Sequence, residues 1–264
     1  MGILNFSGKP EISYKSISGD DNKPCLVFLH EGLGCIDMWK RFPERLCAIT
    51  GCPGLLYDRA GYGKSSRISK KWSVHYMHEY GLDELPRIIS LLIPKKPYIV
   101  IGHSDGGSIG LIHAAQRPEN MVGLITEAAH VFVEPVTVAG IRKATDAYSQ
   151  GRLDGLKKYH GEKTASVFNA WSDIWLSRGF NFWNIEYLLP SVVCPVLAIQ
   201  GEDDQYGTQN QIDAIVSKTN GPVEKRMIAG CAHAPHHEKP DEVVGLMKKF
   251  INTLNCPWGA VHAC

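Results

Sequence analysis

Short apolar segments recur along the chain, and a stretch with helical spacing separates each from the next. Most of their residues are Val, Ile and Leu, and Gly or Pro bounds them; they cover residues 25–29, 54–57, 98–101, 122–125, 196–199 and 225–228. Short runs of this kind are typical of strands that a parallel sheet buries on both faces. The alternation of strand and helix therefore predicts a βαβ architecture.

The intervening stretches carry apolar residues at the spacing of one helix face. They cover residues 37–49, 75–92, 104–116, 209–218 and 241–254. Pro94, Pro118 and Gly221 end three of them, as helix-breaking residues do. Residues 11–18 instead alternate polar and apolar side chains, which predicts an edge strand. We therefore expect an α/β fold with a mostly parallel sheet flanked by helices.

Residues 133–190 interrupt this alternation with a polar, helical and aromatic-rich segment. We expect a helical insertion that lies over the sheet, because a structureless connection of that length is uncommon inside a compact domain. Its rings either pack as core or, in part, face a ligand cavity; they are Phe168, Trp171, Trp175, Phe180, Phe182, Trp183 and Tyr187. Residues 1–132 and 191–264 form the core of an expected single domain.

The composition narrows the class of partner. The chain has 264 residues and a formal net charge of +1, so no global field attracts nucleic acid or an anionic membrane. We expect a small-molecule substrate with an apolar part. The sequence does not predict the oligomeric state. Without an export signal or an apolar run of about 18 residues, a cytoplasmic protein is expected. Eight cysteines without a C-x-x-C pair are expected to be reduced thiols.

Residues 102–106, Gly-His-Ser-Asp-Gly, match G-x-S-x-G between a predicted strand and a predicted helix. In a nucleophile elbow, the sharp turn between these elements lifts the serine hydroxyl above the sheet, and the flanking glycines avoid clashes. The start of the helix directs N–H groups toward a developing oxyanion. We predict that Ser104 is a nucleophile.

A serine nucleophile needs a base and an acid that orients the base. Residues 201–204 follow one predicted strand and bring Asp204, while residues 230–233 follow the next and bring His233. Both loops fall at the carboxyl edge of the sheet, as Ser104 does. We predict His233 as the base and Asp204 as the acid, with Asp203 or Glu202 as the alternative acid.

Three further features of the sequence bear on its chemistry. Gly32 follows the strand at 25–29, where a second oxyanion N–H is supplied in elbow hydrolases; Asp105 is the candidate for the first. Residues 58–65 end in Gly-Lys-Ser, as a phosphate-binding loop does, but they begin with Asp58 where such a loop needs glycine. A phosphate-binding loop is therefore not expected here. The neighbouring histidines at 233, 236 and 237 lack metal-site spacing, so no metal and no cofactor are expected.

Five motifs in order make the chain resemble the α/β-hydrolase superfamily, including its esterase, valacyclovir-hydrolase-like and carbon–carbon hydrolase members. They are H-x-G-x-G, D-R-x-G-x-G-x-S, G-x-S-x-G, G-x-x-D and G-x-x-H, after the third, fourth, fifth, seventh and eighth strands. The resemblance implies an eight-stranded sheet and a Ser104–His233–Asp204 triad. The insertion takes the place of the family's cap, with Trp171 and Trp175 as candidate substrate-binding residues.

Glu31 departs from the pattern, because many members carry glycine after the oxyanion-strand histidine. Glu31 and Asp105 place two carboxylates near the oxyanion site. One hypothesis is that either Glu31 or Asp105 binds a cationic or hydrogen-bond-donating part of the substrate, as the resemblance to valacyclovir-hydrolase-like members implies for the aspartate beside the nucleophile. The alternative is that Glu31 pairs internally with an arginine or a backbone N–H.

The predicted reaction is hydrolysis of an ester or a related acyl bond through an acyl-enzyme, without metal or cofactor. The same triad also serves carbon–carbon hydrolases of ring-cleavage diketones, which are the main alternative among enzymes. A small-ligand receptor on a hydrolase fold is the alternative from another class. Aspartate-dependent epoxide hydrolases and dehalogenases are disfavoured, because the elbow carries Ser104.

Overall fold

A computed structural model describes residues 1–5, 10–67 and 72–254. Its centre is one eight-stranded sheet in the order β1-β2-β4-β3-β5-β6-β7-β8. Strands β3 to β8 run parallel, whereas β2 pairs antiparallel with β1 and β4. The strands are β1 Gly2–Leu4, β2 Ile12–Ile17, β3 Cys25–Leu29, β4 Gly54–Tyr57, β5 Tyr98–His103, β6 Met121–Glu127, β7 Val196–Gly201 and β8 Val223–Ile228. The fold is that of an α/β hydrolase, as expected.

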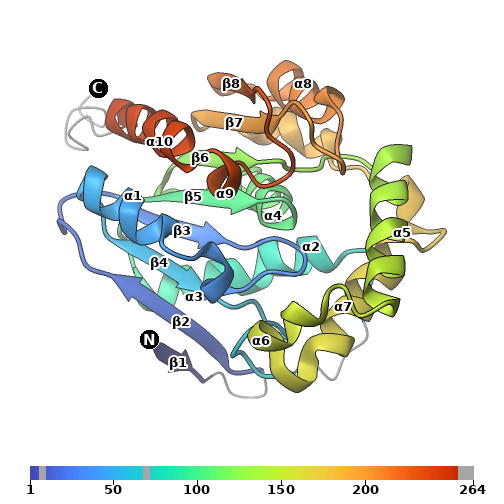
Figure 1. Cartoon of the computed structure of the whole chain (residues 1–264). Helices are drawn as coiled ribbons and strands as arrows, with labels where there is room; N and C mark the ends of the chain where they lie inside the picture. The colour runs from blue at the N-terminus through green and yellow to red at the C-terminus, as the bar shows by residue number, and fades with distance from the viewer. Residues whose placement is uncertain (6–9, 68–71, 255–264) are drawn as a thin grey trace.

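Alternate residues of the central strands enter two separate apolar layers. In β3, Val27 and Leu29 pack in one layer, whereas Leu26 and Phe28 pack in the other. All four side chains are fully buried, as is required of a strand covered on both faces. The sheet is therefore sandwiched between two layers of helices (Figure 1).

The two helical layers come from different parts of the chain. The layer against Leu26 and Phe28 contains the 3₁₀ turn η1 Ile36–Trp39 with α1 Phe42–Thr50, α9 Pro235–Glu238 and α10 Pro240–Leu254. The opposite layer contains α2 Tyr76–Glu79, the π turn η2 Tyr80–Glu84, α3 Leu85–Leu92, α4 Asp105–Ala114 and α8 Gln209–Lys218. No helix of the described ranges is long and apolar enough to cross a bilayer.

Two predicted helices are interrupted. The helix expected at 37–49 breaks at Lys40, whose φ of 53° lies in the left-handed region. The helix expected at 75–92 contains the π turn η2, and Pro86 stands in the first turn of the α-helix that follows. A proline has no N–H to donate to the carbonyl four residues earlier, so the helix widens there.

The segment between β6 and β7 is helical, as expected of an insertion. It contains α5 Pro135–Ser149, η3 Asp154–Leu156, α6 Lys157–His160, η4 Gly161–Lys163, α7 Thr164–Trp175, η5 Phe180–Phe182 and η6 Glu186–Ser191. The expected position over the sheet is wrong: Figure 1 shows α5, α6 and α7 beyond the ends of the parallel strands, because helices already cover both faces. Its rings divide between roles: Phe168 and Phe180 are buried core, whereas Phe182 and Tyr187 are exposed.

Six of the cysteines are free thiols: Cys25, Cys35, Cys47, Cys52, Cys194 and Cys231. All but Cys194 are buried, and burial raises the pKa of Cys25, Cys35 and Cys47 to about 12. They act as small apolar side chains. Cys256 and Cys264 lie outside the described residues.

Candidate active site

Ser104 lies at a strained turn between β5 and α4. Its φ of 53° and ψ of −118° are rare for a residue with a side chain and cost about 1–3 kcal/mol. The backbone compensates: the N–H of Ser104 donates to the carbonyl of Glu127 over 2.8 Å, and its carbonyl accepts from Gly107 over 2.9 Å. The serine is thus held where strand ends and helix begins, as the elbow motif predicts.

The two glycines of the motif are required by close backbone contacts. A Cβ on Gly102 would lie 2.2 Å from the carbonyl oxygen of Gly106. A Cβ on Gly106 would lie 2.0 Å from the carbonyl oxygen of Leu29. Any side chain at either position would push β5, α4 and the end of β3 apart.

His233 connects Ser104 to Asp204. Its Nε2 lies 3.0 Å from Oγ of Ser104, and its Nδ1 lies 2.8 Å from Oδ1 of Asp204. With Nδ1–H donating to the carboxylate, Nε2 is left as the acceptor for the serine proton. Burial alone would raise the pKa of Asp204. The hydrogen bond and charge of His233, together with the N–H of Tyr206, outweigh burial, so the pKa of Asp204 lies below its ordinary value.

Asp204 is the only acid of its loop that reaches the histidine. Its side chain is 1% exposed, whereas Glu202 and Asp203 are exposed to solvent. The structure therefore brings together the three residues that the sequence analysis selected, and leaves Asp203 and Glu202, the alternative acids, outside the group.

The loop after β3 approaches the same point. Gly32 and Ser104 both line one pocket, and a Cβ on Gly32 would lie 2.4 Å from Nε1 of Trp171. The buried guanidinium of Arg59 fixes this loop: Nη2 donates to the carbonyl of Glu31 over 2.8 Å, and Nη1 donates to the carbonyl of His30. The backbone next to Gly32 is therefore held rigidly.

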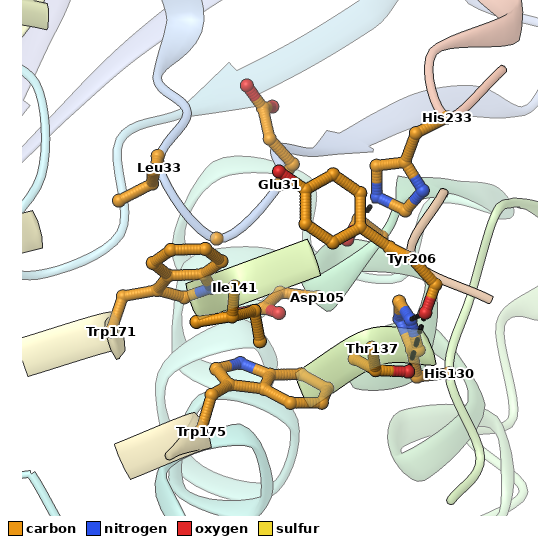
Figure 2. A pocket seen from close by; sticks show the side chains of 12 residues that line it. Glu31, Leu33, Asp105, His130, Thr137, Ile141, Trp171, Trp175, Tyr206 and His233 are labelled. Atoms are coloured by element: carbon orange, nitrogen blue, oxygen red, sulfur yellow. Dashed lines mark hydrogen bonds between the residues drawn. The ribbon is translucent and has the colours of Figure 1, made fainter. Parts of the chain in front are cut away.

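Side chains from the core and from the insertion enclose a pocket of about 110 Å³ around Ser104 (Figure 2). The insertion contributes Thr137 and Ile141 from α5, with Trp171 and Trp175 from α7. The core contributes the rest of the wall: Glu31, Gly32, Leu33, Ser104, Asp105, His130, Tyr206 and His233. The walls are mainly apolar, with a few polar groups at fixed positions, as in small-molecule sites.

The two tryptophans and Glu31, selected from the sequence, do line this pocket. His130 and Tyr206 also line the pocket, and neither was predicted from the sequence. The positions of both residues in the sequence hinted at the site: His130 follows β6 at the same sheet edge, and Tyr206 stands two residues after Asp204. The missing information was the conformation of these loops, in which Nε2–H of His130 donates to the carbonyl of Tyr206 over 3.0 Å.

Asp105 is a buried residue in the wall of the pocket. Its Oδ2 accepts from the hydroxyl of Tyr76 over 2.6 Å, and that hydroxyl accepts from Nε1 of Trp175 over 2.9 Å. Burial raises the pKa of Asp105, although the nearby Arg59 and the Tyr76 bond oppose the rise. Figure 2 shows Asp105 between the indoles of Trp171 and Trp175.

Glu31 pairs internally with a partner that the sequence analysis did not name. The charged partner is not the expected arginine: Oε2 of Glu31 lies 3.7 Å from Nδ1 of His103, while a backbone N–H, that of Glu31 itself, also stabilises the carboxylate as expected. Arg59 contacts only the backbone carbonyl of Glu31. In Figure 2 the Glu31 carboxylate points away from the two indole rings.

A profile of the alpha/beta hydrolase family matches residues 26–246, and the chain belongs to this family. Among known proteins, it is 27% identical to 2-succinyl-6-hydroxy-2,4-cyclohexadiene-1-carboxylate synthase from Enterobacter sp. (strain 638), over 60% of this chain and 55% of the synthase. It is 24% identical to proline iminopeptidase from Lactobacillus helveticus, over 95% of this chain and 97% of the peptidase. Membership of this family supports assignment of the chain to the hydrolase enzymes.

Solved structures share the fold. A carboxylesterase structure from Nitrososphaera gargenis superposes with a TM-score of 0.76 at 20% identity, covering 96% of this chain and 98% of that chain. At this level of identity the likeness establishes architecture, and the chemistry has to be argued from the site.

Proposed function

We propose that this protein is a serine hydrolase that cleaves a small-molecule ester, or a related acyl bond, through an acyl-enzyme. Ser104 is the nucleophile, His233 the general base and Asp204 the acid that orients the base. The observation that carries the proposal is the continuous chain of hydrogen bonds from Asp204 through His233 to Ser104, 2.8 Å and 3.0 Å long. The 3.0 Å contact is within the range in which His233 can take the serine proton directly, and the 2.8 Å contact orients His233.

The reaction follows from this geometry. His233 takes the proton of Ser104 at Nε2 while Oγ attacks the substrate carbonyl. The backbone N–H groups of Gly32 and Asp105 are proposed to hold the oxyanion; Asp105 begins α4, whose N-terminus favours negative charge. The protonated histidine then gives its proton to the leaving group, and Asp204 stabilises the imidazolium. Water, activated by the same histidine, releases the acid.

The insertion is proposed to act as a cap, with residues 133–190 forming the roof and residues 1–132 and 191–264 the core of one domain. Support comes from α5 and α7, which supply Thr137, Ile141, Trp171 and Trp175 to the pocket. A volume of about 110 Å³ is below the ~300 Å³ typical of drug-sized ligands. The proposed substrate is therefore small, with a short apolar acyl or alcohol group against the indoles.

A panel of nitrophenyl esters, amides and thioesters of increasing acyl length tests the proposal. Acetyl and propionyl esters should be hydrolysed fastest, and Ser104→Ala should lower turnover by about three or more orders of magnitude with an unchanged fold. Activity of Ser104→Ala near that of the wild type would remove the mechanism. Turnover of a dienol diketone can be followed by ultraviolet absorbance. If the protein turns over the diketone but hydrolyses no ester of the panel, the carbon–carbon hydrolase is favoured instead.

A further inference from the structure

His103, the residue before Ser104, contacts the backbone that carries the proposed base. His103 is 4% exposed, and its Nε2 lies 2.7 Å from the carbonyl oxygen of His233. A carbonyl only accepts, so Nε2 of His103 carries a proton and donates it. The two imidazole rings lie side by side, with centroids 5.2 Å apart. One end of the His103 ring is thus committed to holding the loop of His233.

The other end of the ring faces Glu31. Nδ1 of His103 is buried without a hydrogen-bond partner in the part of the chain that the structure describes, and Oε2 of Glu31 is 3.7 Å from it. A neutral ring with its proton on Nε2 would direct the Nδ1 lone pair at this carboxylate, which is repulsive. A proton on Nδ1 turns the same contact into an ion pair.

The charges around the ring favour that pair. Burial lowers the pKa of His103, but Glu31 and Glu127 raise it, and the net pKa lies above the ordinary value. Burial raises the pKa of Glu31, but His103, His30 and the backbone N–H of Glu31 together lower it below its ordinary value, so the carboxylate stays charged. The titratable groups that face His103 are Glu31 after β3, Glu127 at the end of β6, His233 after β8, and His236 and His237 in α9.

Glu31 is itself fixed from two sides. Its carbonyl accepts from Nη2 of Arg59 over 2.8 Å and from Nδ1–H of His30 over 2.8 Å. Its carboxylate fills the space above Gly34, where a Cβ would lie 2.1 Å from Oε2. The residue next to the proposed oxyanion donor Gly32 is thus a rigid anchor for the ring of His103.

We propose that Glu31 and His103 are positioning residues. Their ion pair fixes the ring of His103, whose Nε2–H holds the carbonyl of His233. This contact keeps the ring of His233 in line with Ser104. This role rests on the proposed function. Through Glu31 and the buried His103, it links the oxyanion loop, the nucleophile elbow and the loop of the base. In this role Glu31 acts through His103 and does not bind a charged group of the substrate.

The kinetic test compares Glu31→Gln with the wild type on an amino-bearing ester and on a neutral ester of the same size. The positioning role predicts that kcat falls about tenfold on both esters while KM stays within about twofold, because the base is displaced and substrate contacts are kept. A rise in KM confined to the amino-bearing ester would assign Glu31 to substrate binding and overturn the proposal.

A double-mutant cycle tests whether the two residues act as a pair. His103→Leu should lower kcat more than His103→Gln, because the glutamine amide can still donate to the carbonyl of His233. Adding Glu31→Gln to His103→Leu should lower kcat by less than about twofold further. Losses that multiply would show independent roles. His113→Gln is the matched control for a buried histidine remote from the pocket, and its kcat should match that of the wild type.

Two readouts separate this proposal from the proposed function. Nuclear magnetic resonance of labelled histidines should show the pKa of His103 above its ordinary value, with a fall in Glu31→Gln; an unchanged titration would overturn the ion pair. Fluorophosphonate should label Ser104 about tenfold more slowly in Glu31→Gln. Labelling at the wild-type rate would end the positioning role and leave the nucleophile standing, whereas an unreactive wild-type protein would end both.

Discussion

Nδ1 of His233 lies 2.8 Å from Oδ1 of Asp204, while the preceding residue, Asp203, is exposed to solvent. The two neighbouring aspartates therefore have different roles in the proposed mechanism. Only Asp204 can fix the tautomer in which Nε2 of His233 accepts the serine proton. This difference provides a matched pair of variants.

Asp204→Asn should lower kcat by about 10⁴, because an amide can donate to Nδ1 and stabilise the wrong tautomer of His233. Asp203→Asn should stay within about twofold of the wild type, as expected of a solvated surface change. Steady-state rates on one short-chain ester check both. A larger loss in Asp203→Asn than in Asp204→Asn would assign the acid to the other residue.

Trp171 is expected to limit the length of the substrate. Its indole lies directly against Gly32 and lines the pocket. Trp171→Ala should raise the ratio of kcat/KM for octanoyl over acetyl esters by about tenfold or more, because a larger apolar pocket accepts added methylenes. Trp183→Ala is the control, since Trp183 is buried against Phe180, with ring centroids 5.3 Å apart, outside this pocket. An equal rise in both variants would contradict the assignment.

The buried histidines predict how stability changes with pH. Burial lowers the pKa of His113 to about 4; its Nε2 accepts from the hydroxyl of Tyr98 over 2.8 Å, and Nδ1–H donates to the carbonyl of Gly81 over 3.1 Å. Between an unfolded pKa of about 6.5 and the folded pKa of about 4, the unfolded chain binds the extra proton. The free energy of unfolding should therefore fall as the pH is lowered through this window.

Urea unfolding at a series of pH values measures this effect. His113 alone should contribute a slope of up to about 1.4 kcal/mol per pH unit between pH 6.5 and pH 4. His113→Gln should remove that part of the slope, although it also lowers stability at pH 7 because it disturbs the bond from Tyr98. The same slope in the variant and the wild type would show that His113 titrates normally in the folded state.

Local sequence signals predicted most of the elements that carry the site. Residues 209–218 form α8 as expected, and the hydroxyl of Thr208 caps it by accepting from the N–H of Asn210 over 3.1 Å. The elbow was predictable because strand, turn and helix follow one another in the sequence. The break at Lys40 was not, since the apolar spacing continues on both sides of it.

Contacts between distant segments were harder to predict. The pair of Glu31 and His103 follows from the register of β3 beside β5, in which Leu29 is opposite Gly102. The sequence predicts both strands, yet it does not state that they are neighbours or in which register they pair. The division of the aromatic residues of the insertion, with Trp175 in the pocket and Phe182 exposed, likewise depends on how its helices pack.

The central claim is that Ser104 is a nucleophile activated by His233. Incubation with a fluorophosphonate, followed by mass spectrometry of the intact protein and its peptides, measures this most directly. The account predicts one label per chain on the peptide that contains Ser104, no label in Ser104→Ala, and labelling of His233→Ala slowed by about three orders of magnitude. Folded wild-type protein that stays unlabelled, or labels equally fast without His233, would contradict it.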